Sequence, residues 1–460
     1  MGGSCLPSSI TRALAQSLTA WQAHAPELLE AARLLLLDGV AVAAAGASEP
    51  SATIAAGLAR ETEARPQASV IGHGFATSLV GAARINGISM HALDYEPMWF
   101  PPNHVLSCVL PAVLALAESM EQQGREPLGL LVLEALAKGV EAQGRLRLAS
   151  GQLEPRDVTL HPPSAVGAIA AAAASAHLLG LDESTTATAL GIASSRLGGT
   201  LANVGSMTKA LHCGDAAANG LEAAQLASRG FTSDADAIGG PRGWGPVLFG
   251  DRFDPRALQE PVDVPRILDP GPAWKLFPSQ FATHFAISAA LDARRQIADP
   301  AAIARVVLRV PDMPYIDRPA PESGLAGKFS WQYTVAAALL DGRVDRETFA
   351  DSRRFSADME VVLACIELVR DKSIPGEFTR MHVEAHVHTR DGEVIRSRCD
   401  GPPGSWQGPP PAPGAIHAKA RGLLEGAFGS SVSDRVMALA AGPAASLRVA
   451  ELMSLLRGGA

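Results

Sequence analysis

The polar side chains best suited to chemistry gather where a predicted helix breaks at a run of prolines. In the stretch NGISMHALDYEPMWFPPNHVLSC, residues 86–108, Asp94 follows one apolar helix and His104 precedes the next. Histidine titrates near neutral pH, so His104 is a candidate general acid or base and Asp94 a candidate partner that orients it. The free N–H groups at the start of a helix also attract anions. From spacing alone, the alternative is that Asn103 caps the helix and His104 is solvated.

Further histidines and cations stand beside glycine or proline in later stretches. In chain order these candidates are His161, Lys209, His212, Lys275, Tyr315 and Arg318. A lysine ammonium is a compact charge on a flexible stem, so Lys209 and Lys275 are candidate anchors for a carboxylate. Tyr315 and Arg318 lie on a loop held by four prolines, VPDMPYIDRPAP. Taken singly, each of these residues could equally be a surface cation or a loop tyrosine.

Signatures of nucleotide or metal chemistry are weak. No G-x-G-x-x-G, P-loop, G-x-S-x-G or H-E-x-x-H motif occurs, so nothing favours a nucleotide-dependent enzyme or a serine hydrolase. His382, His386 and His388 share one face of a predicted strand, but the opposite face is the better core face. We therefore expect these histidines to be solvated, and we predict no metal and no cofactor.

Periodicity indicates which elements position the candidates. Apolar residues recur at helical spacing from residue 8 to about 250. Proline-rich segments then bracket the best strand signals, which are residues 302–312 and a hairpin over 381–398 that turns at Asp391-Gly392. The predicted helices of the first part are 9–22, 27–46, 51–63, 73–92, 105–123, 127–149, 164–180, 184–198 and 214–229.

The helical pattern resumes after residue 415 and continues to the end of the chain. We therefore predict a mainly α protein in which residues 1–268 and 405–460 form a helical domain. Residues 275–400 would form a smaller α+β lid domain inserted into it. Because ligand sites favour junctions between domains, we expect the site there.

Composition argues against several classes of partner. Of 39 cationic residues only six are lysine, and 47 acidic residues leave a net charge of −8. Without a basic run, neither nucleic acid nor an anionic membrane is expected as the main partner. No apolar stretch reaches the roughly 20 residues of a membrane span. Five scattered cysteines without a C-x-x-C pair predict neither disulfides nor a zinc cluster, so we expect a cytoplasmic protein.

Five stretches, taken in order, resemble the MmgE/PrpD family, whose members are dehydratases, decarboxylases and epimerases of small carboxylic acids. They are the stretches that carry the candidate residues, 86–118, 159–170, 205–220, 273–285 and 310–321. The likeness extends over nearly the whole chain and includes NGISMHALDYE, HPPSAVG, LGLDESTTATALGIASS, KALHCGDAAANGLEAAQLASRGF followed by GGPRGW, and KFSWQYTVAAALLDG. The local motifs are most similar to those of cis-aconitate decarboxylases. The resemblance implies a large helical domain with a smaller α+β lid, assembled as a homodimer.

The resemblance also implies roles for the candidate residues. Matching the family pattern, the expected catalytic residues are His104, Asp94, His161 and Tyr315, and the expected substrate-binding residues are Lys209, Lys275, Arg318 and His212. One stretch departs: the decarboxylases resemble D-[FY]-D-D-T-W-H-P, whereas this chain reads DYEPMWFP. Met98 replaces a threonine and Phe100 a histidine, so this wall is less polar. The change favours a substrate with an apolar substituent or fewer carboxylates over cis-aconitate itself.

Together these observations predict a cofactor-independent lyase that decarboxylates or dehydrates a small di- or tricarboxylate by histidine acid/base catalysis. The substrate would resemble cis-aconitate or 2-methylcitrate. Two alternatives stay open: an epimerase or isomerase that uses two histidines, and a homologue that binds a ligand without turning it over.

Overall fold

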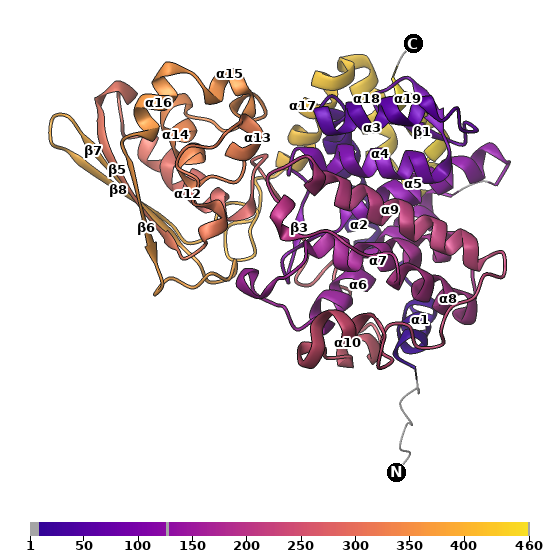
Figure 1. Ribbon diagram of the computed structural model, residues 1–460. Coiled ribbons are helices and arrows are strands. Elements are labelled where there is room, and N and C mark those ends of the chain that lie inside the picture. Colours follow the sequence, from indigo (N-terminus) through magenta and orange to yellow (C-terminus); the bar gives the residue numbers. More distant parts are fainter. Residues whose placement is uncertain (1–8, 126–127, 459–460) are drawn as a thin grey trace.

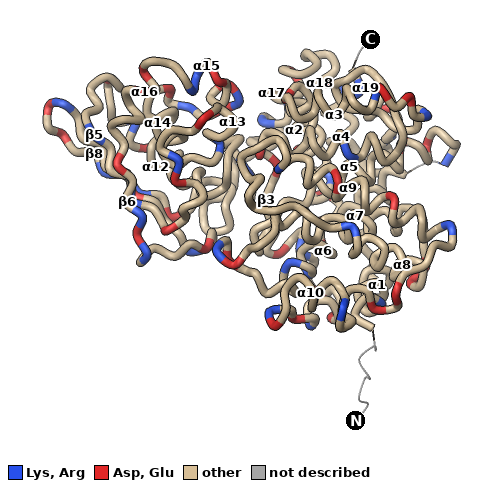
Figure 2. Tube along the Cα trace, in the orientation of Figure 1, with Lys and Arg blue, Asp and Glu red and all other residues tan. Residues whose placement is uncertain are grey.

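A computed structural model describes residues 9–125 and 128–458 of the chain. Figure 1 shows two parts side by side: a large bundle of helices, and a smaller part that combines helices with a four-stranded sheet. This architecture confirms the predicted fold class. Acidic and basic residues are interspersed over both parts (Figure 2). Cys5 lies outside the described residues, and the four described cysteines are free.

The first helices of the large part match the predicted segments closely, and proline begins three of them, at Pro26, Pro50 and Pro162. Proline suits this position because the first turn of a helix has no use for its missing N–H. The helices are α1 Ile10–Ala20, α2 Pro26–Gly46, α3 Pro50–Glu61, α4 Leu79–Ala92, α5 Leu106–Gln122, α6 Gly129–Ala149, α7 Pro162–Leu179, α8 Glu183–Ser194, α9 Thr208–Ala227, α10 Trp244–Phe249 and α11 Arg256–Gln259.

Two helix starts differ from the prediction. Residues 73–78 are not helical, because β1 Ala68–Val70 and β2 Phe75–Thr77 form a small hairpin. Its turn places Gly72 and Gly74 at φ 74° and 72°, a left-handed conformation that suits glycine and interrupts a helix. Conversely, α9 begins at Thr208, earlier than predicted, so Lys209 lies in its first turn.

The C-terminal helices return to the large part. They are α17 Ala415–Phe428, α18 Ser430–Ala441 and α19 Val449–Arg457. Their apolar residues, including Leu424, Val436 and Leu452, belong to the same buried core as α2 and α5. Figure 1 shows these yellow helices beside the indigo N-terminal ones. Both ends of the chain therefore build one core, while the exact domain boundaries stay a prediction.

The smaller part is organised around a sheet of order β6-β5-β7-β8. β5 Ile303–Pro311 pairs in parallel with β6 Ile366–Asp371 and antiparallel with β7 Val383–Thr389, which continues into β8 Val394–Cys399. The hairpin turns at Asp391-Gly392 as predicted, with Gly392 at φ 91°. Burial alternates along β7, so its valines face the core and its histidines do not. The helices of this part are α12 Phe281–Arg294, α13 Gly324–Gly327, α14 Trp331–Asp341, α15 Asp351–Arg354 and α16 Ala357–Leu363.

One described helix is long and apolar enough to cross a bilayer by length and composition. This is α7, and 83% of it is buried inside the structure. Its alanines pack against neighbouring helices, as expected for the centre of a helical core.

Glycine allows α4 and α9 to approach closely. A Cβ atom on Gly214 would lie 2.3 Å from the Arg84 carbonyl oxygen, and one on Gly87 would lie 2.8 Å from Gly214 Cα. Only glycine, which carries a hydrogen atom in place of a side chain, fits at this helix crossing. The close approach brings the end of α4 beside the beginning of α9, where functional side chains meet.

We expect Gly214→Ala to lower the free energy of unfolding by about 1–3 kcal/mol, because the added methyl group must push two backbones apart. The matched control is Gly57→Ala in α3, where a Cβ atom meets nothing within 4 Å. It should raise stability by up to about 1 kcal/mol through helix propensity. Chemical denaturation monitored by circular dichroism measures both effects. Equal midpoints for the two variants would contradict the packing argument.

Candidate active site

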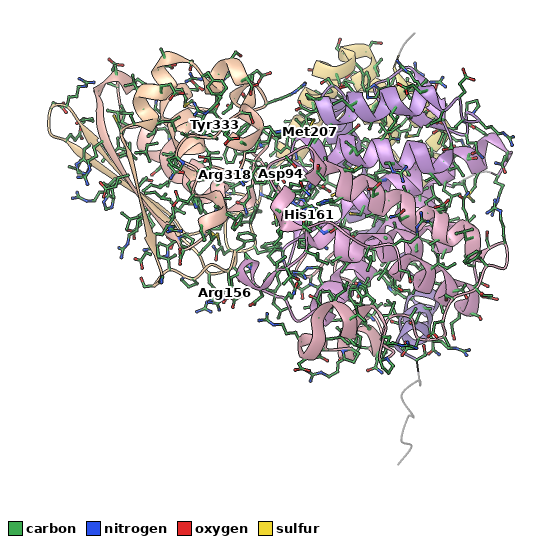
Figure 3. The ribbon with its side chains drawn as sticks, in the orientation of Figure 1. Asp94, Arg156, His161, Met207, Arg318 and Tyr333 are labelled. Carbon is green, nitrogen blue, oxygen red and sulfur yellow. The ribbon has the colours of Figure 1, made fainter. Side chains whose placement is uncertain are left out.

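Asp94 stands at the centre of the site in an unusual backbone conformation. It follows α4 with φ 51°, and its amide donates to the His91 carbonyl at 2.9 Å. Left-handed conformations are uncommon outside glycine, although aspartate tolerates them. Such residues cluster at functional sites, where the surrounding structure holds them in place. Figure 3 shows Asp94 and His161 near the junction of the two parts.

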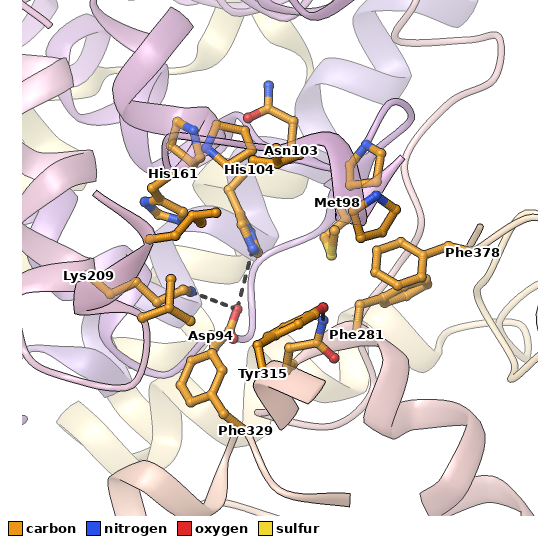
Figure 4. A pocket seen from close by; sticks show the side chains of 18 of the residues that line it. Asp94, Met98, Asn103, His104, His161, Lys209, Phe281, Tyr315, Phe329 and Phe378 are labelled. Carbon is orange, nitrogen blue, oxygen red and sulfur yellow. Dashed lines mark hydrogen bonds and ion pairs between the residues drawn. The ribbon is translucent and has the colours of Figure 1, made fainter. Parts of the chain in front are cut away.

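One oxygen of the Asp94 carboxylate meets three nitrogens. Oδ1 lies 2.6 Å from Lys275 Nζ, 3.4 Å from Lys209 Nζ and 3.4 Å from His104 Nε2. Burial favours the neutral acid, but the charges of Lys209 and Lys275 outweigh it and hold the pKa of Asp94 well below its usual range. Asp94 is therefore ionised. Figure 4 shows its contacts with Lys209 and His104.

Three histidines surround this ion cluster, each from a different element. His91 comes from the last turn of α4, His104 from the short strand β4 Asn103–His104, and His161 from the residue that precedes α7. Burial, together with the nearby lysine charges, lowers the pKa of each imidazole well below its usual value. All three are therefore neutral in the free protein at neutral pH.

A buried network lies directly behind the cluster. Glu96 Oε1 lies 2.7 Å from His91 Nδ1, and His91 Nε2 lies 2.7 Å from Lys209 Nζ. Glu96 Oε2 also accepts a hydrogen bond from the Ser107 amide at 2.8 Å. Burial raises the pKa of the Glu96 carboxyl to about 7. Near neutral pH a proton is therefore shared along the contacts from Glu96 through His91 to Lys209, which contacts Asp94.

Among the described residues, His91, Glu96 and His104 offer ligand atoms within 4.8 Å of one another. Such a spacing suits a metal ion by distance. However, the Lys209 ammonium already contacts His91, and a second ammonium, Lys275, contacts Asp94 at 2.6 Å. Like charges so close oppose a further cation, so the geometry fits a proton network better.

Three buried lysines hold the chain segment that carries Asp94. Lys328 Nζ donates to the Ala92 carbonyl at 3.1 Å, Lys275 Nζ to the Asp94 carbonyl at 2.9 Å, and Lys419 Nζ to the Tyr95 carbonyl at 2.8 Å. Lys419 comes from the C-terminal helix α17 and pairs with Asp38 at 2.9 Å. The left-handed turn is therefore fixed from both parts of the molecule. The sequence patterns had predicted no role for Lys328, Lys419 or His91.

The cluster opens into a cavity of about 280 Å³ between the two parts. Seven of the eight predicted site residues line it: Asp94, His104, His161, Lys209, Lys275, Tyr315 and Arg318. On the smaller part, the Tyr315 hydroxyl accepts a hydrogen bond from Gln280 Nε2 at 2.8 Å. Arg318 donates to the carbonyls of Tyr315 and Val204 at 3.1 and 3.2 Å, which anchors its guanidinium at the cavity.

His212 is the predicted site residue that does not line this cavity. Its Nδ1 lies 3.2 Å from Nδ1 of His161, and its other side faces a separate hollow near Arg196 and Asp215. Direct contact between His212 and a substrate is therefore not supported by the geometry. The hydrogen bond instead suits a residue that orients His161.

Comparison with known proteins identifies the family of this chain. The MmgE/PrpD N-terminal domain matches residues 12–256, and the MmgE/PrpD C-terminal domain matches residues 277–441. The chain belongs to the MmgE/PrpD family. The C-terminal match extends into α17 and α18, the helices that return to the large part.

Several relatives are named after one activity. The cis-aconitate decarboxylases of Mus musculus and Homo sapiens are each 33% identical to this chain, over 71% of it and over 68% and 69% of their own lengths. A cis-aconitate decarboxylase-like protein of Aspergillus oryzae is 28% identical over 94% of this chain and 93% of its own. These matches support a lyase, a decarboxylase or dehydratase, as the class of this family member.

The charge state of Lys275 gives a prediction about pH. Burial lowers the pKa of Lys275 to about 8 from its ordinary 10.5, so its ammonium loses a proton as the pH rises through 8. The cavity then loses a positive charge, and affinity for a polycarboxylate should fall by up to about tenfold per pH unit above 8. Between pH 8 and 10.5 the unfolded chain binds more protons, so this group's contribution to stability rises with pH.

Titration calorimetry with cis-aconitate between pH 7 and 9.5 measures the affinity. Lys372→Met provides the control, because Lys372 is exposed and does not line the cavity. This variant should keep the wild-type pH profile. Constant affinity of the wild-type protein up to pH 9.5 would contradict the assignment.

Proposed function

We propose that this protein is a cofactor-independent lyase that releases carbon dioxide from a small unsaturated di- or tricarboxylate. The observation that carries the proposal is the Asp94 carboxylate, which holds Lys209, Lys275 and His104 at the wall of one cavity. Fixed cations beside an imidazole suit a reaction in which an anion binds and a carbon atom gains a proton. The names of the relatives support decarboxylation as the first choice.

Substrate binding would also prepare the acid. Lys209, Lys275 and His104 all contact Asp94. Burial and the two ammonium charges oppose a positive charge on the His104 imidazole and so lower its pKa. A bound carboxylate offsets these two ammonium charges, so the pKa of His104 should rise toward neutrality in the complex. His104 Nδ1 lies 3.7 Å from Glu96 Oε1, which stabilises the imidazolium once it forms.

The chemical step then needs no further group. The bond to the departing carboxylate breaks, carbon dioxide leaves, and the electron pair spreads through the adjacent double bond into a remaining carboxylate. Lys209 and Lys275 stabilise that developing charge electrostatically. His104 then donates its proton to the carbon α to the remaining carboxylate, and the imidazole regains a proton from solvent.

Two histidines on one cavity also keep the epimerase or isomerase alternative open, since His104 and His161 could each exchange a proton with one carbon. Dehydration would use the same pair to remove a proton and assist the departure of hydroxide. Mass spectrometry of reactions run in deuterium oxide separates the cases. A decarboxylase product loses the mass of carbon dioxide, a dehydratase product loses that of water, and an epimerase product only exchanges hydrogen for deuterium.

We expect His104→Ala and Lys209→Ala each to lower kcat/KM by at least about a thousandfold, because one removes the proton donor and the other a charge that stabilises the carbanion. Steady-state assays of carbon dioxide release, with circular dichroism to verify folding, measure the effect. The control is His417→Ala, an exposed histidine of α17 that does not line the cavity. Near-wild-type rates in both site variants would refute histidine catalysis.

We also propose that the protein acts as a homodimer in the cytoplasm, as the family resemblance and the scattered cysteines suggest. Light scattering after size exclusion should then give about twice the chain mass of 47.7 kDa. A mass equal to that of one chain would contradict the dimer.

A further inference from the structure

The cavity has two chemically different sides. Figure 4 shows Lys209 and His161 on one side and an apolar wall of Met98, Phe281 and Phe378 across from them. The wall residues are buried, and the rings of Phe281 and Phe378 pack at 5.3 Å between centroids. Met98 is fixed through its backbone, which exchanges hydrogen bonds with Ala273 at 2.9 and 2.7 Å. The wall is therefore buried and apolar and offers no hydrogen-bond partner to a charged group.

The charged residues that line the cavity limit how many negative charges of a ligand can be balanced there. Lys209, Lys275 and Arg318 carry positive charge and Asp94 carries negative charge, so the formal excess is two positive charges. The histidines add none in the free protein, because burial lowers their pKa values. A dianion balances this excess while His104 is neutral, and a third carboxylate would depend on the proton that His104 takes up in the complex.

The smaller part contributes to the cavity the neutral polar side chains of Gln280 and Tyr315 and the cationic side chain of Arg318. Gln280 Nε2 donates to the Tyr315 hydroxyl, which leaves the hydroxyl proton of Tyr315 available to a ligand oxygen. Arg318 lies on the same loop and also lines the cavity. A second carboxylate can therefore bind at Tyr315 and Arg318 while the first binds at Lys209 and Lys275. No cation among the described lining residues remains for a third carboxylate at the wall.

We propose that the natural substrate is an unsaturated dicarboxylate with an alkyl or similar apolar arm, and that the arm packs against Met98, Phe281 and Phe378. This inference rests on the proposed lyase function. In chemical terms the substrate corresponds to cis-aconitate with its central carboxylate replaced by an apolar group, a 3-alkylglutaconate. Loss of carbon dioxide from its saturated arm and protonation at the α carbon would yield a 3-alkyl-3-butenoate.

The test compares cis-aconitate with 3-alkylglutaconates whose alkyl group runs from methyl to butyl. Because each buried methylene contributes about 0.8 kcal/mol, kcat/KM should rise about fourfold per methylene until the wall is covered. The best alkyl compound should exceed cis-aconitate by at least about tenfold. A value for cis-aconitate above every alkyl compound, or no dependence on chain length, would overturn the inference.

Binding separates this inference from the proposed reaction. If no compound is turned over, the lyase proposal fails, and calorimetric Kd values for the same series still test the arm. Kd values that fall with chain length would support the apolar subsite. Absence of binding, or tighter binding of cis-aconitate than of every alkyl compound, would overturn it.

A substitution at Met98 tests whether the alkyl arm of the substrate packs against this wall. Met98→Ala should lower the ratio of butyl to methyl kcat/KM, or of the corresponding affinities, by about tenfold, because it removes part of the wall. Met437→Ala is the matched control: this methionine is buried in α18 and does not line the cavity. It should leave the ratio unchanged. An unchanged ratio in Met98→Ala would overturn the placement of the arm.

Discussion

The sharing of one carboxylate by two ammonium groups and an imidazole is the interaction on which the site depends. Asp94 Oδ1 reaches Lys275, Lys209 and His104 only because the backbone turns left-handed after α4 and points this side chain into the cavity. Each partner comes from a different segment of the chain. The fold can therefore be understood as the set of elements that brings these segments to one point.

The scarcity of lysine acquires a physical meaning in this setting. Of six lysines in the chain, Lys372 is exposed and Lys138 is buried in α6, where it donates to the Leu18 carbonyl. The other four, Lys209, Lys275, Lys328 and Lys419, have their ammonium groups buried close to the 92–95 segment. A buried ammonium needs acceptors around it, and here the carbonyls at the end of α4 provide them. Arginine, which is larger and planar, carries most of the positive charge elsewhere.

Much of the fold could be predicted because its signals are local. Apolar periodicity predicted α2, α5 and α6 to within a few residues, and the Asp-Gly pair predicted the β7–β8 hairpin. The helix expected from residue 73 failed because the glycine turn between β1 and β2 competes with the helical pattern. The close packing of α4 and α9 places Lys209 beside His91. This contact could not be predicted, because neither helix sequence alone indicates which other helix it packs against.

In the candidate site, too, residues with local sequence signals could be predicted, whereas residues that depend on contacts between distant segments could not. Motif order predicted seven of the residues that line the cavity, since proline and glycine mark where each helix begins or ends. It gave no role to His91, Lys328 or Lys419, each of which contacts a residue more than 100 positions away in the sequence. It also predicted that His212 binds substrate, whereas His212 contacts His161 and does not line the cavity.

Lys209 and Lys275 already pair with Asp94, so a bound substrate must share these two ammonium groups with the Asp94 carboxylate. Such sharing is electrostatically favourable only for carboxylates that lie close to Lys209 and Lys275, where water is largely excluded. Further from the cluster the cavity is closed by aromatic rings of the smaller part, which stabilise apolar groups and exclude charge. The charged groups and the apolar wall thus lie on opposite sides of the cavity, and both parts of the molecule contribute residues to each.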